Sequence, residues 1–147
     1  MPPENFDSLP PTDAARNQAN SILSSVNNSQ LFHVQLEGDT VFISPRSRLS
    51  EFDFALIEIE GKQIANWLEQ QTLTPHLVVD LENSEYFGSS AVGTFVRWWR
   101  IVNAREGRLA MCNLSAQATE LLRITQLDSL WHIAESRDAA IRWIAAP

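Results

Sequence analysis

The chain of 147 residues is 44% hydrophobic and 20% charged, which is enough for one globular domain with a proper core. Its formal net charge is -7, and Lys62 is the single lysine among eleven basic residues. This balance argues against a nucleic-acid surface, which needs clustered cations. No apolar run reaches the roughly 20 residues of a membrane-spanning helix. We therefore expect neither nucleic acid nor a membrane among the partners.

The single cysteine, Cys112, lies in an apolar run. One cysteine cannot form a disulfide or a thiolate metal site within one copy of the chain. A single unpaired cysteine suits a reducing compartment, so we expect a cytoplasmic protein that needs no metal or cofactor.

Residues 1–29 are rich in proline, asparagine and serine and contain few large apolar side chains. Such a composition cannot offset the entropy of ordering, so we expect a mobile N-terminal tail, with a short helix near Asp13 to Leu23. The folded domain is expected to span residues 30–147. It should begin with a hairpin of alternating strands around Glu37-Gly38-Asp39.

The rest of the chain alternates between helical and strand-like patterns. Apolar residues recur at helical spacing from Phe52 to Gln71, with Gly61 as a weak point, and a break follows at Thr74-Pro75. Later helices are expected at 90–105, ended by Gly107, in "AQATELLRITQL", and in "SRDAAIRWIAA" with Ser136 as its N-cap. The apolar runs "HLVVDL", "RLAMCNL" and "LWHIA" read as buried strands. This alternation predicts an α/β fold with a mainly parallel sheet.

The stretch "YFGSSAVGTF", residues 86–95, lies where a strand ends and a helix begins, which is the working edge of such sheets. Gly88 and Gly93 have the spacing of a phosphate-binding loop, but Thr94 and Phe95 stand where that loop needs a lysine and a hydroxyl residue. A hydrolase elbow would use Ser89 or Ser90 with a distant base. That reading lacks the elbow's second glycine.

Three further residues bear on catalysis. His132 is the candidate base of the hydrolase reading, with Asp80 to orient it, but it lies in an apolar strand, as a core histidine does. Asp80, Glu82 and Glu85 crowd the loop before the serines. Nothing in their spacing fixes the convergence that acid/base catalysis needs, so a solvated acidic loop is the favoured interpretation.

The serines also have a purely structural explanation, because a serine at a helix start bonds the first N–H groups of that helix. The helix itself has two apolar stripes. One, enough to cover the sheet, consists of Val92, Phe95, Val96, Trp99 and Val102, and the flanking one of Ala91, Thr94, Trp98 and Ile101. If the first stripe is the core, Trp98 and Ile101 form an exposed partner-binding patch beside the serines. The alternative is that another helix covers Trp98.

From about residue 31 to 144 the chain resembles the STAS family, the domain type of bacterial anti-sigma factor antagonists. Typical members have a hydrophobic strand, then Asp-Ser-Ser/Thr-Gly-Leu-Gly, a long helix, and a Gly before a strand ending in Asn/Asp-Leu-Ser-Pro. The matching segments here are "HLVVDLENSEYF", "GSSAVGTFVRWWRIVNAREGRLAMCNLSAQATELLRITQLDSLW" and "SRDAAIRWI".

The resemblance implies a mixed, mainly parallel sheet of four to five strands, helices mainly on one face, and no catalysis by the domain. It also implies docking to an anti-sigma factor with serine-kinase activity, or to another signalling protein. By position, the family aspartate falls on Gly88, the phosphorylated serine on Ser89, the adjacent hydroxyl on Ser90 and the family glycine on Ala91. A phosphate there, near Asp80, Glu82 and Glu85, would turn binding off.

Two departures from the family pattern keep alternatives open. Gly88 removes the carboxylate beside the acceptor, and Ala91 adds a Cβ to the turn. Related domains without a usable acceptor serve as constitutive binders or scaffolds. Our first hypothesis is an anti-sigma factor antagonist that docks through the Gly88 to Ile101 surface, with Ser89 or Ser90 as phosphoacceptor. The second is a non-phosphorylated scaffold that assembles or self-associates through Trp98 and Ile101. A serine hydrolase is the third.

Overall fold

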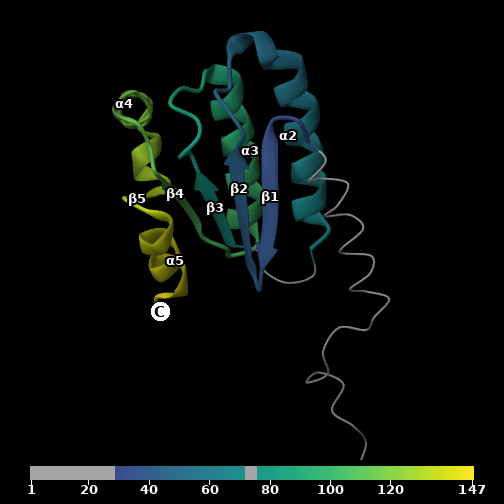
Figure 1. The fold of residues 1–147 in the computed structure, drawn as a ribbon. Coiled ribbons are helices and arrows are strands. Elements are labelled where there is room, and N and C mark those ends of the chain that lie inside the picture. Colours follow the sequence, from purple (N-terminus) through teal and green to yellow (C-terminus); the bar gives the residue numbers. More distant parts are fainter. Residues whose placement is uncertain (1–28, 72–75) are drawn as a thin grey trace, which may run out of the picture.

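The computed structural model describes residues 29–71 and 76–147, and Figure 1 shows their fold. The tail expected at residues 1–29, except for Ser29, lies outside the described residues. The same is true of the expected helix near Asp13 to Leu23 and of the break at Thr74-Pro75.

The described chain begins with the expected hairpin. Strand β1 (Phe32–Glu37) pairs antiparallel with β2 (Thr40–Pro45), and Glu37 lies opposite Thr40. The two-residue connection requires a positive backbone φ, which Gly38 adopts at 62°. The hairpin prediction is confirmed.

Three parallel strands extend this hairpin into a five-stranded sheet of order β1-β2-β3-β4-β5. They are β3 (His76–Asp80), β4 (Leu109–Cys112) and β5 (His132–Ala134). β3 and β4 are buried almost throughout, which explains their unbroken apolar sequences. The predicted fold class, a mixed and mainly parallel sheet, is confirmed.

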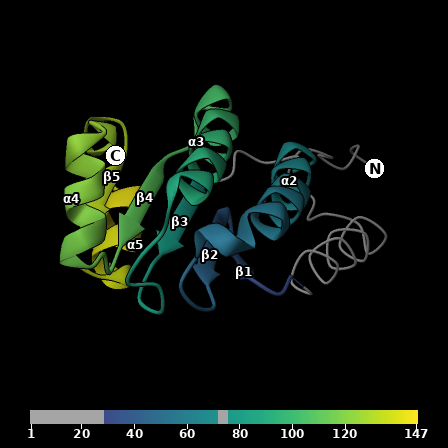
Figure 2. The ribbon, with the colours of Figure 1, turned by 90° about the horizontal axis from the view of Figure 1, so that it is seen from above.

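Helices cover both faces of the sheet unequally, as Figure 2 shows from above. Three helices share one core cluster with the side chains of one sheet face, and the last helix packs with Phe42, Val78, Ala110 and Cys112 on the other face. The first three are α2 (Phe54–Glu69), α3 (Ser89–Ala104) and α4 (Ala116–Ile124), the last is α5 (Arg137–Ala145), and the 3-10 turns are η2 (Glu51–Asp53) and η3 (Leu127–Ser129).

Helix ends follow capping chemistry in most cases. The Ser136 hydroxyl accepts a hydrogen bond from the N–H of Ala139 at 3.1 Å, which confirms the predicted cap of α5. The end of α3 differs from expectation, because Glu106 rather than Gly107 takes the left-handed conformation, with φ 62°. Gly107 instead donates its N–H to the Val102 carbonyl at 2.8 Å and closes the last turn.

Helices α2 and α3 pack closely at Gly61. A Cβ added at Gly61 would lie 2.6 Å from the Thr94 methyl group, so only a glycine permits this approach. The Trp98 indole N–H donates to the Gly61 carbonyl at 3.0 Å. At the other end, the Arg105 guanidinium donates to carbonyls in the last turn of α2, among them that of Leu68 at 3.0 Å. Gly61 is therefore the point of helix contact and not a weak point.

This contact corrects the predicted faces of α3. Ala91, Thr94 and Trp98 are buried together with Phe95 and Val102, and Ile101 is partly buried. The expectation that Trp98 is exposed is wrong, and the alternative that another helix covers it is confirmed. Of the stripe assigned to the core, Val92, Val96 and Trp99 are only partly buried. The helix buries the stripe that faces α2 as well as the sheet.

Candidate functional site

The candidate site is the turn between β3 and α3, at the edge where β2 and β3 end. Two neighbouring segments hold it. The N–H of Leu49 donates to the Tyr86 carbonyl at 3.2 Å, and Leu49 forms a parallel bridge with Phe87. On the other side, the Ser115 hydroxyl donates to the Glu85 carbonyl at 2.6 Å. The loop that leads to the serines is thus hydrogen-bonded on both sides.

Neither serine caps the helix. Gly88 is the N-cap residue of α3 and supplies no side-chain bond, while Ser89 and Ser90 are the first two helical residues. Their hydroxyl groups make no hydrogen bond within the described residues. Ser89 is exposed and Ser90 is half-buried. The structural explanation for the serines is therefore wrong, and Ser89 presents a free hydroxyl to solvent at a helix start.

A second carboxylate stands near the position that the family aspartate would occupy. A Cβ added at Gly88 would lie 3.2 Å from Cγ of Glu51 and 3.7 Å from its Oε1. Glu51 comes from η2, and the sequence analysis did not single it out. Its side chain fills the room beside Gly88 and puts negative charge near the N-terminus of α3, where the helix dipole favours it.

The solvent-facing stripe of α3 differs from the predicted patch. It contains Ser89, Gly93, Arg97 and Arg100. No atom of residues 29–71 and 76–147 lies within 4 Å of the place where a Cβ of Gly93 would be. A glycine in a helix interior costs roughly 1 kcal/mol relative to alanine, and no contact within the described residues requires it here. Because Gly93 has no side chain, the helix surface is flat one turn after Ser89. We call the exposed surface of Ser89 and Gly93 the shelf.

The carboxylates of the acidic loop differ in burial. Asp80 is buried on the α5 face, where its Oδ1 accepts hydrogen bonds from Asn113 Nδ2 at 2.9 Å and from the N–H of Glu82 at 3.1 Å. Its Oδ2 lies 3.8 Å from the Arg137 guanidinium. The expectation that Asp80 adds charge beside a phosphorylated Ser89 is therefore wrong. Glu82 and Glu85 are exposed.

Cys112 adjoins this polar cluster and is buried. Burial, followed by the nearby negative charge of Asp80, raises the pKa of its thiol from 9.0 to about 12. The thiol is therefore protonated at neutral pH and is not a nucleophile.

The raised pKa of Cys112 predicts a loss of stability at alkaline pH. The thiol ionises at about pH 9 in the unfolded chain and at about pH 12 in the folded protein. Below pH 9 it is protonated in both states, and above pH 9 ionisation lowers the free energy of the unfolded state only. The free energy of unfolding, compared with that of Cys112→Ala, should fall by about 1 kcal/mol per pH unit above 9. Urea titrations at several pH values measure it, and a constant difference between the two proteins up to pH 11 would contradict the burial of the thiol.

The arrangement for a serine hydrolase is not formed by the described residues. The His132 ring stacks on Trp143, with ring centroids 4.3 Å apart, and no contact joins it to Asp80 or to either serine. Two surface cavities have linings that include neither Ser89 nor Ser90. One is lined by His33, Ser44, Pro45, Arg46, Asp80, Glu82, Asn83 and Arg137, and the other by Thr119, Leu122, Asp128, Trp131, His132 and Ile133.

Among residues 29–71 and 76–147 no group of His, Cys, Asp and Glu side chains has the arrangement of a metal site. No helix in those ranges has the length and apolar character needed to cross a membrane.

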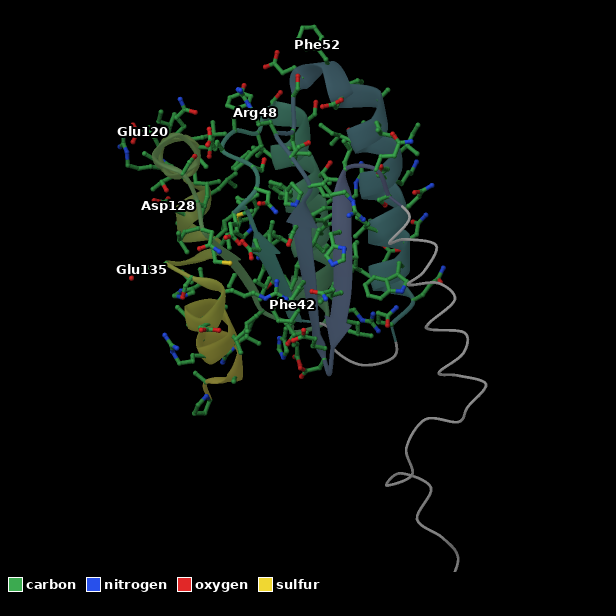
Figure 3. The ribbon with its side chains drawn as sticks, in the orientation of Figure 1. Phe42, Arg48, Phe52, Glu120, Asp128 and Glu135 are labelled. Carbon is green, nitrogen blue, oxygen red and sulfur yellow. The ribbon has the colours of Figure 1, made fainter. Side chains whose placement is uncertain are left out.

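Sequence reasoning missed one residue next to the site. Phe52 is 100% exposed in η2 and projects from the end of the molecule, as Figure 3 shows. It was included in an apolar helical pattern because hydrophobic spacing alone does not reveal which member of a pattern stays outside the core. A signal was present in Ser50, which could end one segment and start the next as a cap.

A family model and the solved structures both indicate the same domain type. The sequence model of the STAS domain matches residues 49–140. A STAS domain protein from Planctomyces limnophilus, described as an anti-sigma-factor antagonist, is 27% identical. It aligns with a TM-score of 0.69 over 78% of this chain and 98% of its own. No curated protein sequence matches.

Two more distant structures share the fold. A Thermotoga maritima protein proposed to be an anti-sigma factor antagonist is 16% identical, with a TM-score of 0.71 over 82% of this chain and 99% of its own. The Bacillus anti-sigma factor antagonist SpoIIAA in its unphosphorylated form is 20% identical, with a TM-score of 0.64 over 79% of this chain and 98% of its own.

Proposed function

This chain belongs to the STAS domain family, and from that premise we propose that it is a cytoplasmic anti-sigma factor antagonist controlled by phosphorylation of Ser89. Its partner is an anti-sigma factor with serine-kinase activity. The single observation that carries the proposal is the Ser89 hydroxyl, which is exposed at the first residue of α3 and makes no hydrogen bond with the described residues. Ser90, half-buried and one residue later, is the less accessible acceptor.

The flat shelf of α3 supports docking at this place. Gly93 lies one turn after Ser89 on the exposed stripe, and no described residue lies within 4 Å of its Cβ position. A partner backbone or helix can therefore approach closely. This replaces the predicted Trp98 patch, since Ala91, Thr94 and Trp98 are buried and reach no partner in the folded domain.

A phosphoserine at this position acts as a local switch. It adds roughly two negative charges and three bulky oxygens to a surface that a partner must cover closely. Covering it removes water from the dianion, which costs binding free energy, whereas the N-terminus of α3 tolerates the charge within the protein. Binding is lost while the fold is kept. The Bacillus protein SpoIIAA has structures in both an unphosphorylated and a phosphorylated form.

Mass spectrometry of the protein recovered from its own cells tests the modification. The peptide that contains Ser89 and Ser90 should carry a phosphoryl group under some growth or stress conditions, with fragment ions that place it on Ser89. A peptide that stays unmodified under all of them refutes the phosphorylation.

A mimic of the modified state should separate binding from stability. Ser89→Glu is expected to weaken binding to the anti-sigma factor by about tenfold or more, because it places a charge on the shelf. The free energy of unfolding should change by less than about 0.5 kcal/mol, since Ser89 is exposed. Calorimetric titration and urea unfolding measure the two quantities. Ser129→Glu, an exposed serine in η3, is the matched control and should bind like the unmodified chain.

A specific observation favours a second candidate, a scaffold that is not phosphorylated. Residue 88 is glycine where the family has an aspartate, and the Glu51 side chain occupies the room beside it. This carboxylate from another element would repel a phosphate on the neighbouring Ser89. If Ser89 stays unmodified, a stable homo-oligomer or a constitutive complex, detected by sedimentation of the purified protein alone and with the partner, would support the scaffold.

A further inference from the structure

The most exposed large apolar side chain of the described residues lies beside the candidate site. Phe52 is 100% exposed, and Phe54, two residues later, is more than half exposed. A phenylalanine that the fold leaves wholly in water gains nothing from folding, and its burial by a partner would be worth as much as that of a core side chain. Figure 3 shows it projecting from the end of the molecule.

The turn that carries Phe52 is ordered by its own hydrogen bonds. The Ser50 hydroxyl accepts from the N–H of Phe52 at 3.1 Å, and the N–H of Asp53 donates to the Ser50 carbonyl at 3.0 Å. Helix α2 follows at once and is anchored on α3 through Gly61. The ring is therefore presented on a preorganised element, which lowers the entropy cost of docking.

The same turn is joined to the serine site. Leu49 bridges Phe87, and the side chain of Glu51 lies 3.2 Å from the Cβ position of Gly88. Phe52 is therefore one residue from a side chain that touches the residue before Ser89. The turn that carries the projecting ring is thus joined, through Leu49 and Glu51, to the residues that lead into Ser89.

The acidic residues around Phe52 indicate which charge a partner surface should carry. Phe52 stands between the carboxylates of Glu51 and Asp53, and Glu85 is exposed on the loop that leads to Phe87. The nearby cation Arg48 already lies over the Tyr86 ring, at 5.6 Å from its centroid. The exposed cations of the α3 stripe, Arg97 and Arg100, lie two to three turns beyond Ser89. Around Phe52 itself an acidic partner face would be repelled, whereas basic side chains around an apolar pocket would be attracted.

We infer that Phe52 is the apolar anchor by which the protein partner is held, and that the partner offers an apolar pocket rimmed by Lys or Arg side chains. The inference rests on the proposed function, because it concerns the surface around Ser89, and it adds an anchor that phosphorylation does not alter. Contact at Phe52 supplies affinity, and contact at the Ser89 shelf supplies control.

The test begins with a photo-crosslinking phenylalanine analogue placed at position 52 of the full chain in its own cells. The same analogue at Ile124, an exposed apolar residue of α4, is the matched control. The protein captured at position 52 is then purified and titrated with the unmodified chain, Phe52→Ala and Ile124→Ala. Phe52→Ala should weaken binding about 30-fold or more. Ile124→Ala should change it less than about twofold, and rising ionic strength should weaken binding of the unmodified chain.

Phe52→Ala should leave the domain folded, because the Phe52 ring is fully exposed. Each result therefore either supports or overturns the inference. Equal affinity of Phe52→Ala and the unmodified chain overturns it, as does a crosslink that joins only two copies of this chain. A partner that crosslinks from position 89 but not from 52 overturns the anchor and leaves the proposed function standing. A partner that needs Phe52 yet binds Ser89→Glu unchanged confirms the anchor and refutes control by Ser89.

Discussion

Trp98→Ala is expected to destabilise the domain by about 3 to 5 kcal/mol, which is a large part of the stability of a small domain. Trp98 is 0% exposed, and its ring contacts Phe32 and Phe95 with centroid distances of 5.2 and 5.5 Å. Alanine would leave a cavity between α2, α3 and the sheet. It would also leave the Gly61 carbonyl without the indole donor that it accepts from at 3.0 Å.

Urea unfolding followed by circular dichroism measures this loss. Trp98→Phe is the informative companion, because it keeps most of the buried ring and removes only the N–H donor, so it should cost clearly less than alanine. Trp99→Ala, the neighbouring and only partly buried tryptophan, should also cost less. If Trp98→Ala folds with unchanged stability and loses only partner binding, Trp98 is not in the core and the description of α3 is wrong.

The contrast between Trp98 and Trp99 shows where sequence reasoning stops. The hairpin at Gly38, the buried strands and the cap at Ser136 depend on local chemistry, and the sequence predicts them. The two stripes of α3 are both apolar, so periodicity cannot say which one faces a neighbouring helix. That choice depends on Gly61, thirty-seven residues from Trp98, which lets α2 approach.

The candidate site was also predictable only where it depends on local sequence. The start of a helix at the end of a strand follows from the pattern around Gly88, and this places Ser89 at the working edge. The free hydroxyl of Ser89 could not be foreseen, since a serine at that point more commonly caps its helix. The connection of the turn with Glu51 and Phe52 to the serine site depends on the bridge between Leu49 and Phe87. No local sequence pattern predicts that bridge.

Gly61→Ala should also destabilise the domain, although alanine is the better helix former by about 1 kcal/mol. The added Cβ would lie 2.6 Å from the Thr94 methyl group, and both residues are buried. Either the helices separate, which lengthens the hydrogen bond from Trp98 to the Gly61 carbonyl, or the Thr94 side chain turns and loses its hydrogen bond to the Ser90 carbonyl. We expect a net loss of about 1 to 3 kcal/mol of unfolding free energy.

Thr94→Ala provides the decisive partner in a double-mutant cycle. It removes the two atoms that a Cβ at Gly61 would meet at 2.6 and 3.1 Å and leaves the Thr94 Cβ at an ordinary 3.4 Å. The double variant should therefore be more stable than the sum of the single losses predicts, by about 1 kcal/mol or more. Gly93→Ala, on the open face of α3, is the matched control and should stabilise the domain by about 0.5 to 1 kcal/mol. Additive losses at Gly61 and Thr94 would show that the contact between α2 and α3 does not limit the packing of the domain.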